Sequence, residues 1–135
     1  MSVSNTTTSD SLVELPESPL GYVAIVLALV TAVIHLRLAP QVIGFSQTLA
    51  ILFALNGLGF LGGIGLFLTR FWRRELYLVA AVYALVTVLA LFAFQGFGVD
   101  AFYIQGQLNP MAVVSKAVEV LLAVVTGFLY ANTDA

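Results

Sequence analysis

The sequence predicts an all-α fold, an integral membrane bundle of four transmembrane helices. Of the 135 residues, 61% are hydrophobic and only 9% are charged, whereas soluble domains carry about 25% charged residues. Four apolar stretches, at about residues 20–39, 45–69, 76–97 and 111–131, are each long enough to cross a hydrocarbon core of about 30 Å. In each stretch small and polar residues recur at spacings of three and four, which places them on one helix face.

Residues 1–18 are predicted to form a disordered acidic tail that precedes a membrane domain at residues 19–131. The tail contains Asp10, Glu14 and Glu17 but neither Lys nor Arg. A secretory signal peptide has a basic beginning and a shorter apolar core than the roughly 19 residues found here. We therefore expect the first apolar stretch to be a membrane span and not a cleaved leader.

The first span, residues 20–39, is bounded by Pro19 and Pro40, and we expect Pro40 to end the helix. The third span, residues 76–97, carries small and polar residues on one stripe, as the first span does. The two stripes are formed by Ala24, Ala28, Thr31 and His35, and by Tyr77, Ala81, Ala84 and Thr87.

The second span, residues 45–69, has no charged residue and contains five glycines. Gly59 and Gly63 form a Gly-x-x-x-Gly pair, and Asn56 precedes them on the same stripe. Small residues at this spacing let helices approach closely in lipid, where no hydrophobic force drives helices together. We therefore expect this span to be the central packing strip of the bundle.

The connections between spans indicate an orientation. Arg70, Arg73 and Arg74, in the turn at residues 70–75, are three of the five basic residues. The positive-inside rule predicts that this turn and both termini lie on the cytoplasmic side of the cell membrane. The connection at residues 98–110 is expected to lie in the outer interface or to dip into the membrane, and Asn109-Pro110 is expected to begin the last helix.

Apart from Arg37 near the end of the first span, three ionisable residues lie inside the predicted spans: His35, Lys116 and Glu119. A charge there costs about 2.5–3.5 kcal/mol on insertion scales. Lys116 and Glu119 are three residues apart on one helix and are expected to pair. The predicted topology places this pair and His35 in the outer third of the membrane, with Asn56 deeper. The candidate site is therefore an intramembrane polar cluster of His35, Asn56, Lys116 and Glu119.

Three interpretations of this cluster are open. It fixes helix register, or Glu119 and His35 handle a proton or ion, or the cluster lines a pocket for a lipid headgroup, a quinone or a small solute. The sequence predicts no catalytic residue, because it holds no Ser-His pair, paired carboxylates or metal-ligand set.

No cofactor, metal or nucleic acid is expected. A haem with two histidine ligands would need more than the single His35. His35 and Glu119 alone would leave a tetrahedral metal site two ligands short. The chain has no cysteine, and its five basic residues are scattered and form no patch for nucleic acid.

Short motifs in three spans make the chain similar to the small, uncharacterised four-span membrane proteins common in haloarchaea. These motifs are Ile34-His35-Leu36, Leu55-Asn56-Gly57 with Gly59-Phe60-Leu61, and Lys116-x-x-Glu119. The resemblance covers most of residues 20–131 and implies a location and a fold but no reaction, since such proteins have no assigned activity. The single Lys and the acidic tail also suggest a halophilic, archaeal source.

Two functional hypotheses follow. The first is a non-enzymatic membrane protein that acts in the lipid bilayer as an accessory subunit, with a membrane-protein partner, or as a homo-oligomer. The alternative is a small transporter or channel that uses the His35, Lys116 and Glu119 cluster as a polar pathway. An intramembrane enzyme is disfavoured by the lack of a catalytic constellation.

Overall fold

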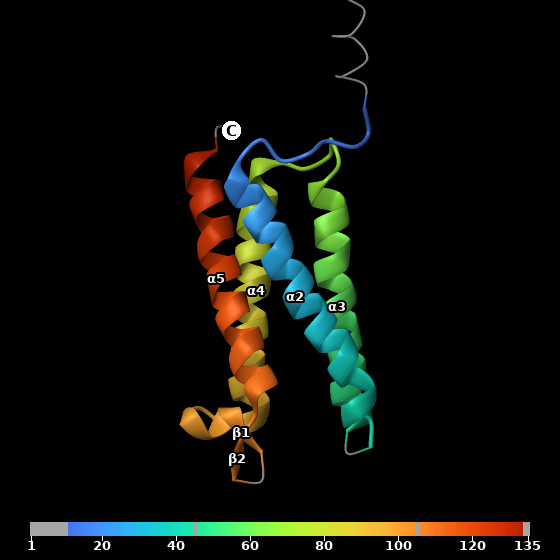
Figure 1. Ribbon diagram of the computed structural model, residues 1–135, viewed down its shortest axis with the longest axis vertical. Helices are drawn as coiled ribbons and strands as arrows, with labels where there is room; N and C mark the ends of the chain where they lie inside the picture. Colours follow the sequence, from blue (N-terminus) through green and yellow to red (C-terminus); the bar gives the residue numbers. More distant parts are fainter. Residues whose placement is uncertain (1–10, 45, 105, 134–135) are drawn as a thin grey trace, which may run out of the picture.

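Four long helices make up most of the computed structural model, which describes residues 11–44, 46–104 and 106–133 (Figure 1). The helices are α2 (Pro19–Val42), α3 (Gln47–Phe67), α4 (Arg74–Gln95) and α5 (Pro110–Asn132). Each helix is long and apolar enough to cross a membrane. The predicted all-α, four-helix transmembrane fold is therefore confirmed.

The ends of two helices differ from the predicted ends for identifiable reasons. Helix α2 continues through Pro40 to Val42, although we expected Pro40 to end it. Because Pro40 lies in the last turn, its missing N–H deprives only the carbonyl of Leu36 of a helical donor. Helix α4 ends at Gln95 because Gly96 adopts a φ of 98°, which stops the helix and which glycine tolerates.

The connection between α4 and α5 is more ordered than the sequence indicated. It forms the 3-10 helix η1 (Val99–Phe102) and the strands β1 (Tyr103–Ile104) and β2 (Gln107–Leu108). The strands pair antiparallel, with Tyr103 opposite Leu108. Phe102 packs edge-on against Phe92 of α4, with 5.8 Å between the ring centroids. Asn109 occupies the expected N-cap position of α5, but its side chain makes no capping hydrogen bond.

The helices form two hairpins joined mainly through α2. Helix α2 packs along α3, α4 packs along α5, and α2 also packs against α5. Figure 1 shows α2 crossing obliquely, near α5 at its first end and near α3 at its last end. Among the described residues, α3 makes no comparable contact with α4 or α5. The side between α3 and α4 is therefore joined by side-chain contacts, such as the packing of Tyr83 on Phe60, and not by close backbone packing.

The prediction that the glycine-rich span is the centre of the bundle is wrong. Among the described glycines of α3, Gly57 alone lies against the backbone of a neighbouring helix: a Cβ on it would lie 2.7 Å from Cγ of Leu36 and 3.0 Å from the carbonyl oxygen of Ala32. A Cβ on Gly59 would clash with the Tyr83 side chain of α4. A Cβ on Gly63 would meet no described atom within 4 Å. Helix α3 is peripheral because α2, and not α3, packs against the α4–α5 hairpin.

The apolar core instead gathers around the alanine face of α2. Alanine suits this position because its small side chain lets neighbouring helices approach closely in lipid. The buried cluster consists of Ala24, Ala28, Ala32, Phe60, Ala84, Leu122 and Ala123. The small-residue stripes predicted for the first and third spans thus lie largely inside, whereas Gly59 and Gly63 of the second span are exposed.

The predicted disordered tail has two parts with different outcomes. Residues 1–10 lie outside the described residues, and their disorder stays a prediction. Residues 11–18 differ from the prediction, because Val13 forms a β-bridge with Thr69. The N–H of Glu14 donates to the carbonyl of Leu68 at 2.8 Å. The segment is ordered because the turn between α3 and α4 supplies its backbone with hydrogen-bond partners.

Candidate functional site

Lys116 and Glu119 form an ion pair on α5, with 2.7 Å between Nζ and Oε1. Their spacing of three residues brings both side chains to one face of the helix, as the sequence predicted. The Glu119 side chain is 0% exposed, and the Lys116 side chain is 10% exposed. Both residues therefore point into the bundle and not toward lipid, and each compensates the charge of the other.

His35 reaches this pair through Thr31, one turn earlier on α2. The Thr31 hydroxyl donates to Oε2 of Glu119 at 2.5 Å, and Nδ1 of His35 lies 3.2 Å from the same hydroxyl oxygen. Nδ1 also lies 2.9 Å from the carbonyl oxygen of Thr31. Because a carbonyl only accepts, Nδ1 is the protonated nitrogen of the ring. His35 is 3.8 Å from Glu119, so Thr31 carries the hydrogen-bonded connection.

Asn56 joins the pair from α3 through Thr87 of α4. Nδ2 of Asn56 donates to the Thr87 hydroxyl at 2.8 Å, and Nζ of Lys116 donates to the Thr87 carbonyl at 3.4 Å. The Tyr83 hydroxyl donates to the backbone carbonyl of Asn56 at 2.9 Å. The two bonds of Asn56 directly connect α3 and α4. Oδ1 of Asn56 is buried and has no hydrogen-bond partner among the described residues.

The structure thus brings all four candidate residues into one network, to which Thr31 and Thr87 contribute the links. Both threonines belong to the predicted polar stripes, but neither was among the predicted site residues. The sequence feature that could have identified Thr31 is its position four residues before His35, on the same helix face. Threonine in a membrane helix is too common a residue for that spacing to single it out.

A cavity of about 480 Å³, the Lys116 cavity, adjoins the network. Residues of all four helices line it. Its polar wall includes His35, Asn56, Thr87, Ser115 and Lys116, and its apolar wall includes Leu52, Phe53, Val86, Leu91 and Phe94. Its volume is within the range of about 300–1,000 Å³ that is usual for small-molecule sites. Glu119, which has no exposed surface, lies behind Lys116 and does not line this cavity.

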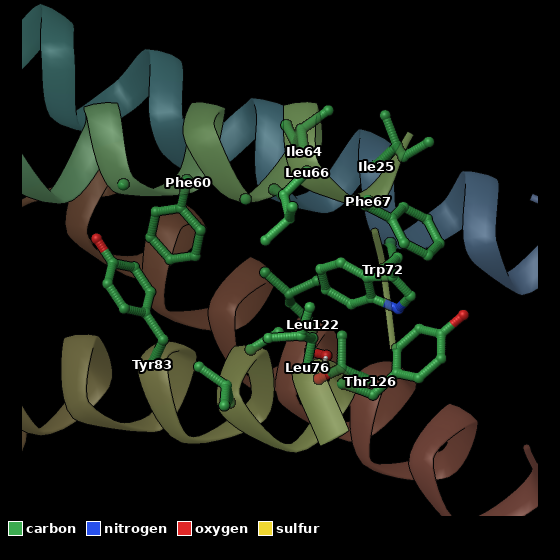
Figure 2. Close-up of a pocket in the computed structure, with 17 residues that line it drawn as sticks. Ile25, Phe60, Ile64, Leu66, Phe67, Trp72, Leu76, Tyr83, Leu122 and Thr126 are labelled. Atoms are coloured by element: carbon green, nitrogen blue, oxygen red, sulfur yellow. Dashed lines mark hydrogen bonds between the residues drawn. The ribbon is translucent and has the colours of Figure 1, made fainter. Parts of the chain in front are cut away.

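A second, apolar cavity of about 170 Å³, the Trp72 cavity, lies nearer the α3–α4 turn (Figure 2). Trp72 packs edge-on against Phe67 at a centroid distance of 4.9 Å. Tyr83 lines both cavities, and its ring packs edge-on against Phe60 at 4.8 Å. Figure 2 shows Phe60 and Tyr83 together at one end of the Trp72 cavity. This aromatic pair therefore lies where the two cavities meet.

The chemistry available at the network concerns charge and protons. Lys116 and Glu119 cancel, so the network is neutral while His35 is neutral. Across the described parts of the chain, no group of three or more His, Cys, Asp or Glu residues could hold a metal ion. The network offers a continuous series of hydrogen bonds from His35, in the cavity wall, to the buried carboxylate of Glu119.

A family of unknown function, DUF7475, matches the chain over residues 6–130. The chain belongs to the DUF7475 family. The match includes all four helices up to the last turn of α5. No curated protein matches the chain, and no solved structure does. Membership of DUF7475 agrees with the expected uncharacterised family, whereas the haloarchaeal source stays a prediction.

Proposed function

We propose that this multi-pass membrane protein is a small, non-enzymatic transporter whose solute passes through the Lys116 cavity. One observation carries the proposal: a buried ion pair borders a cavity of about 480 Å³ between two helix hairpins. Ionisable side chains inside membrane helices commonly mark substrate or proton pathways. In many transporters the substrate site likewise lies at the interface of two structural halves that rock against each other.

The cavity favours this proposal over a role in helix register alone. A network that only fixes register needs close packing around its polar groups, because unfilled space forfeits dispersion contacts. Here His35, Asn56 and Lys116 adjoin open volume. Between the hairpins, α3 and α4 have far fewer backbone contacts than α2 and α5 have, so the α3–α4 seam is the side on which the cavity would open.

The proposed orientation places the mouth of the Lys116 cavity on the outer side of the cell membrane. Gln41, Gln95 and Asn109 line this cavity and lie at the ends of α2 and α4 and the start of α5. The Arg-containing turn between α3 and α4 lies at the opposite end, together with the last turn of α5 (Figure 1). The positive-inside rule supports a cytoplasmic location for that end.

Accessibility of a single cysteine tests the transport proposal. The chain has no cysteine, so Ser115→Cys in the cavity wall would provide the sole thiol. A membrane-impermeant thiol reagent is applied to intact cells and to inverted membrane vesicles. A transporter exposes its site to both sides in turn, so we expect reaction in both preparations.

The matched control is Val120→Cys on the same helix, 44% exposed on the lipid-facing surface. It is expected to remain unreactive in both preparations, because the charged reagent does not enter the bilayer. Reaction of Ser115→Cys from one side only would identify a blind cavity and contradict transport.

A second candidate function is that of an accessory subunit or homo-oligomer. The observation that favours it is the open glycine face of α3. A Cβ on Gly62, Gly63 or Gly65 would meet no described atom within 4 Å. Such a face lets a helix of a membrane partner, or of a second copy, approach closely. The particle mass in mild detergent tests this candidate: Gly63→Leu should reduce the mass of an assembly, and a wild-type monomer would contradict it.

A further inference from the structure

We propose that the Lys116 cavity binds a small monovalent anion with an apolar body, and that one proton binds with it. This inference rests on the proposed function only in taking the cavity as a solute site. The first step concerns charge. The positive Lys116 and the negative Glu119 cancel, and the neutral His35 adds nothing. In this state the site gives an anion no net electrostatic attraction.

One added proton changes the charge of the site from zero to plus one. The imidazole Nε2 of His35 takes up the proton from the cavity. Nδ1 then releases its proton to the Thr31 hydroxyl oxygen, and the Thr31 hydroxyl proton passes to Oε2 of Glu119. Thr31 ends with one proton, as it began. The net result is one proton gained by the network, and the site is positive wherever along this series the proton stays.

The geometry directs the new positive charge toward the cavity. Glu119 is fully buried and lies behind Lys116, whereas Lys116 and His35 are in the cavity wall. A proton on Glu119 leaves the Lys116 ammonium without its counter-charge. A proton on His35 makes the imidazole itself cationic. In both cases the unbalanced cation faces the cavity, where the low dielectric of the surroundings strengthens its attraction for an anion.

The other charged groups near α5 do not cancel this charge. On α2, Arg37 is exposed, and on η1 Asp100 is exposed. On α4, Arg74 lies at the far end of the bundle, where its Nε donates to the Tyr130 carbonyl at 2.9 Å. Tyr83 of α4 faces the cavity as a neutral donor to Asn56. Among the described residues lining the cavity, Lys116 is the sole Lys, Arg, Asp or Glu.

The rest of the wall of the Lys116 cavity determines which apolar group the anion carries. It is formed mainly by aliphatic and aromatic side chains, such as Leu52, Phe53, Val86, Leu91 and Phe94. A carboxylate with a ring or a branched chain matches one cationic end and an apolar wall. A divalent anion would leave an uncompensated negative charge in a low-dielectric site, which is strongly unfavourable.

Benzenesulfonate binding to the purified protein in detergent, measured by calorimetry, tests the proposal. This probe stays anionic in the accessible pH range, so any pH dependence of its affinity belongs to the protein. Between about pH 8 and about pH 5, we expect affinity to rise by up to about tenfold per pH unit for one coupled proton. Neutral benzenesulfonamide, of almost the same shape, should show no such rise.

Two variants separate charge from structure. Glu119→Gln leaves Lys116 permanently without a counter-charge, so at about pH 8 it should bind benzenesulfonate as tightly as wild type binds at about pH 5. Adding Lys116→Gln to Glu119→Gln should abolish this binding at about pH 8. Thr126→Val is the control, because this buried hydroxyl bonds only carbonyls of its own helix. It should bind as wild type does.

The proposal is overturned if wild type binds the sulfonate equally at both pH values, or if the sulfonamide shows the same pH dependence. The comparison of wild-type binding at the two pH values tests the proposal even when a variant does not fold. Failure of the anion proposal is distinguishable from failure of transport. Sulfonate binding with one-sided Ser115→Cys labelling retains the anion site and rejects transport. Labelling of Ser115→Cys from both sides without pH-dependent sulfonate binding retains transport and rejects the anion site.

Discussion

Glu119 has no exposed surface, and its partner Lys116, 2.7 Å away, separates it from a cavity of about 480 Å³. The pair connects three helices, because Glu119 accepts from Thr31 of α2 and Lys116 donates to Thr87 of α4. One pair of charges therefore makes polar contacts with two other helices at once.

Breaking this pair should cost more stability than removing it completely. Lys116→Met alone leaves a buried carboxylate without its counter-charge and should lower the free energy of unfolding by about 3–5 kcal/mol. Lys116→Met combined with Glu119→Leu removes both charges and should cost much less. Thermal unfolding in detergent, compared across wild type, both single variants and the double variant, gives the coupling energy. Additive effects of the two substitutions would contradict a direct pair.

Thr31→Val should be more destabilising than Thr126→Val, although both hydroxyls are buried. Removing the Thr31 hydroxyl takes a donor from the buried Glu119 carboxylate, at a cost of about 1–3 kcal/mol. The Thr126 hydroxyl bonds only Leu122 and Ala123 carbonyls of its own helix, and its loss should cost less than about 1 kcal/mol. The two variants are compared by denaturant unfolding. Equal losses would mean that Thr31 does not support Glu119.

The number and type of the helices could be predicted from sequence, whereas their mutual arrangement could not. Hydropathy over about 20 residues is a strong signal, because lipid leaves the backbone few alternatives to a helix. The prediction of which helix is central was wrong because every span carries a small-residue stripe. The glycines of α3 promised the closest packing, yet only Gly57 contacts a neighbouring helix backbone.

The same limit applies to the site. The spacing of Lys116 and Glu119 predicted their contact, because helix geometry alone fixes it. The link from Glu119 to Thr31 spans 88 residues of sequence, and no local pattern determines it. The ordered segment around Val13 was missed for a similar reason, since its hydrogen-bond partners are backbone groups of the distant α3–α4 turn.

Gly57→Ala and Gly63→Ala should have opposite consequences for stability. A Cβ at Gly57 would lie 2.7 Å from Leu36 and force α2 and α3 apart, at a cost of about 1–3 kcal/mol. A Cβ at Gly63 meets no described atom within 4 Å, and alanine favours a helix by about 1 kcal/mol over glycine. Thermal unfolding in detergent should therefore show a lower midpoint for Gly57→Ala only. A lower midpoint for Gly63→Ala would indicate a contact with another chain.

Backbone amides at Glu14 and Arg70 should exchange slowly with deuterium. Glu14 N–H donates to the Leu68 carbonyl at 2.8 Å, and Arg70 N–H donates to the Leu12 carbonyl at 2.9 Å. Such bonds protect an amide until the local structure opens. Glu14→Pro removes one donor and should accelerate exchange at Arg70, as followed by mass spectrometry. Rapid exchange at Arg70 in wild type would mean that the segment is not held in place.

The separation of 88 residues in sequence between Thr31 and Glu119 also has a consequence for biosynthesis. Helix α2 is made first and α5 last, so the polar groups of α2 enter the membrane well before their partner exists. Until α5 arrives, Thr31 and His35 remain on a helix surface without the carboxylate that they contact in the finished protein. Insertion of α5 closes the network and completes the core in the same event. A chain that stops before α5 therefore exposes Thr31 and His35 to the bilayer without the Glu119 carboxylate. This exposure distinguishes an unfinished molecule from a finished one.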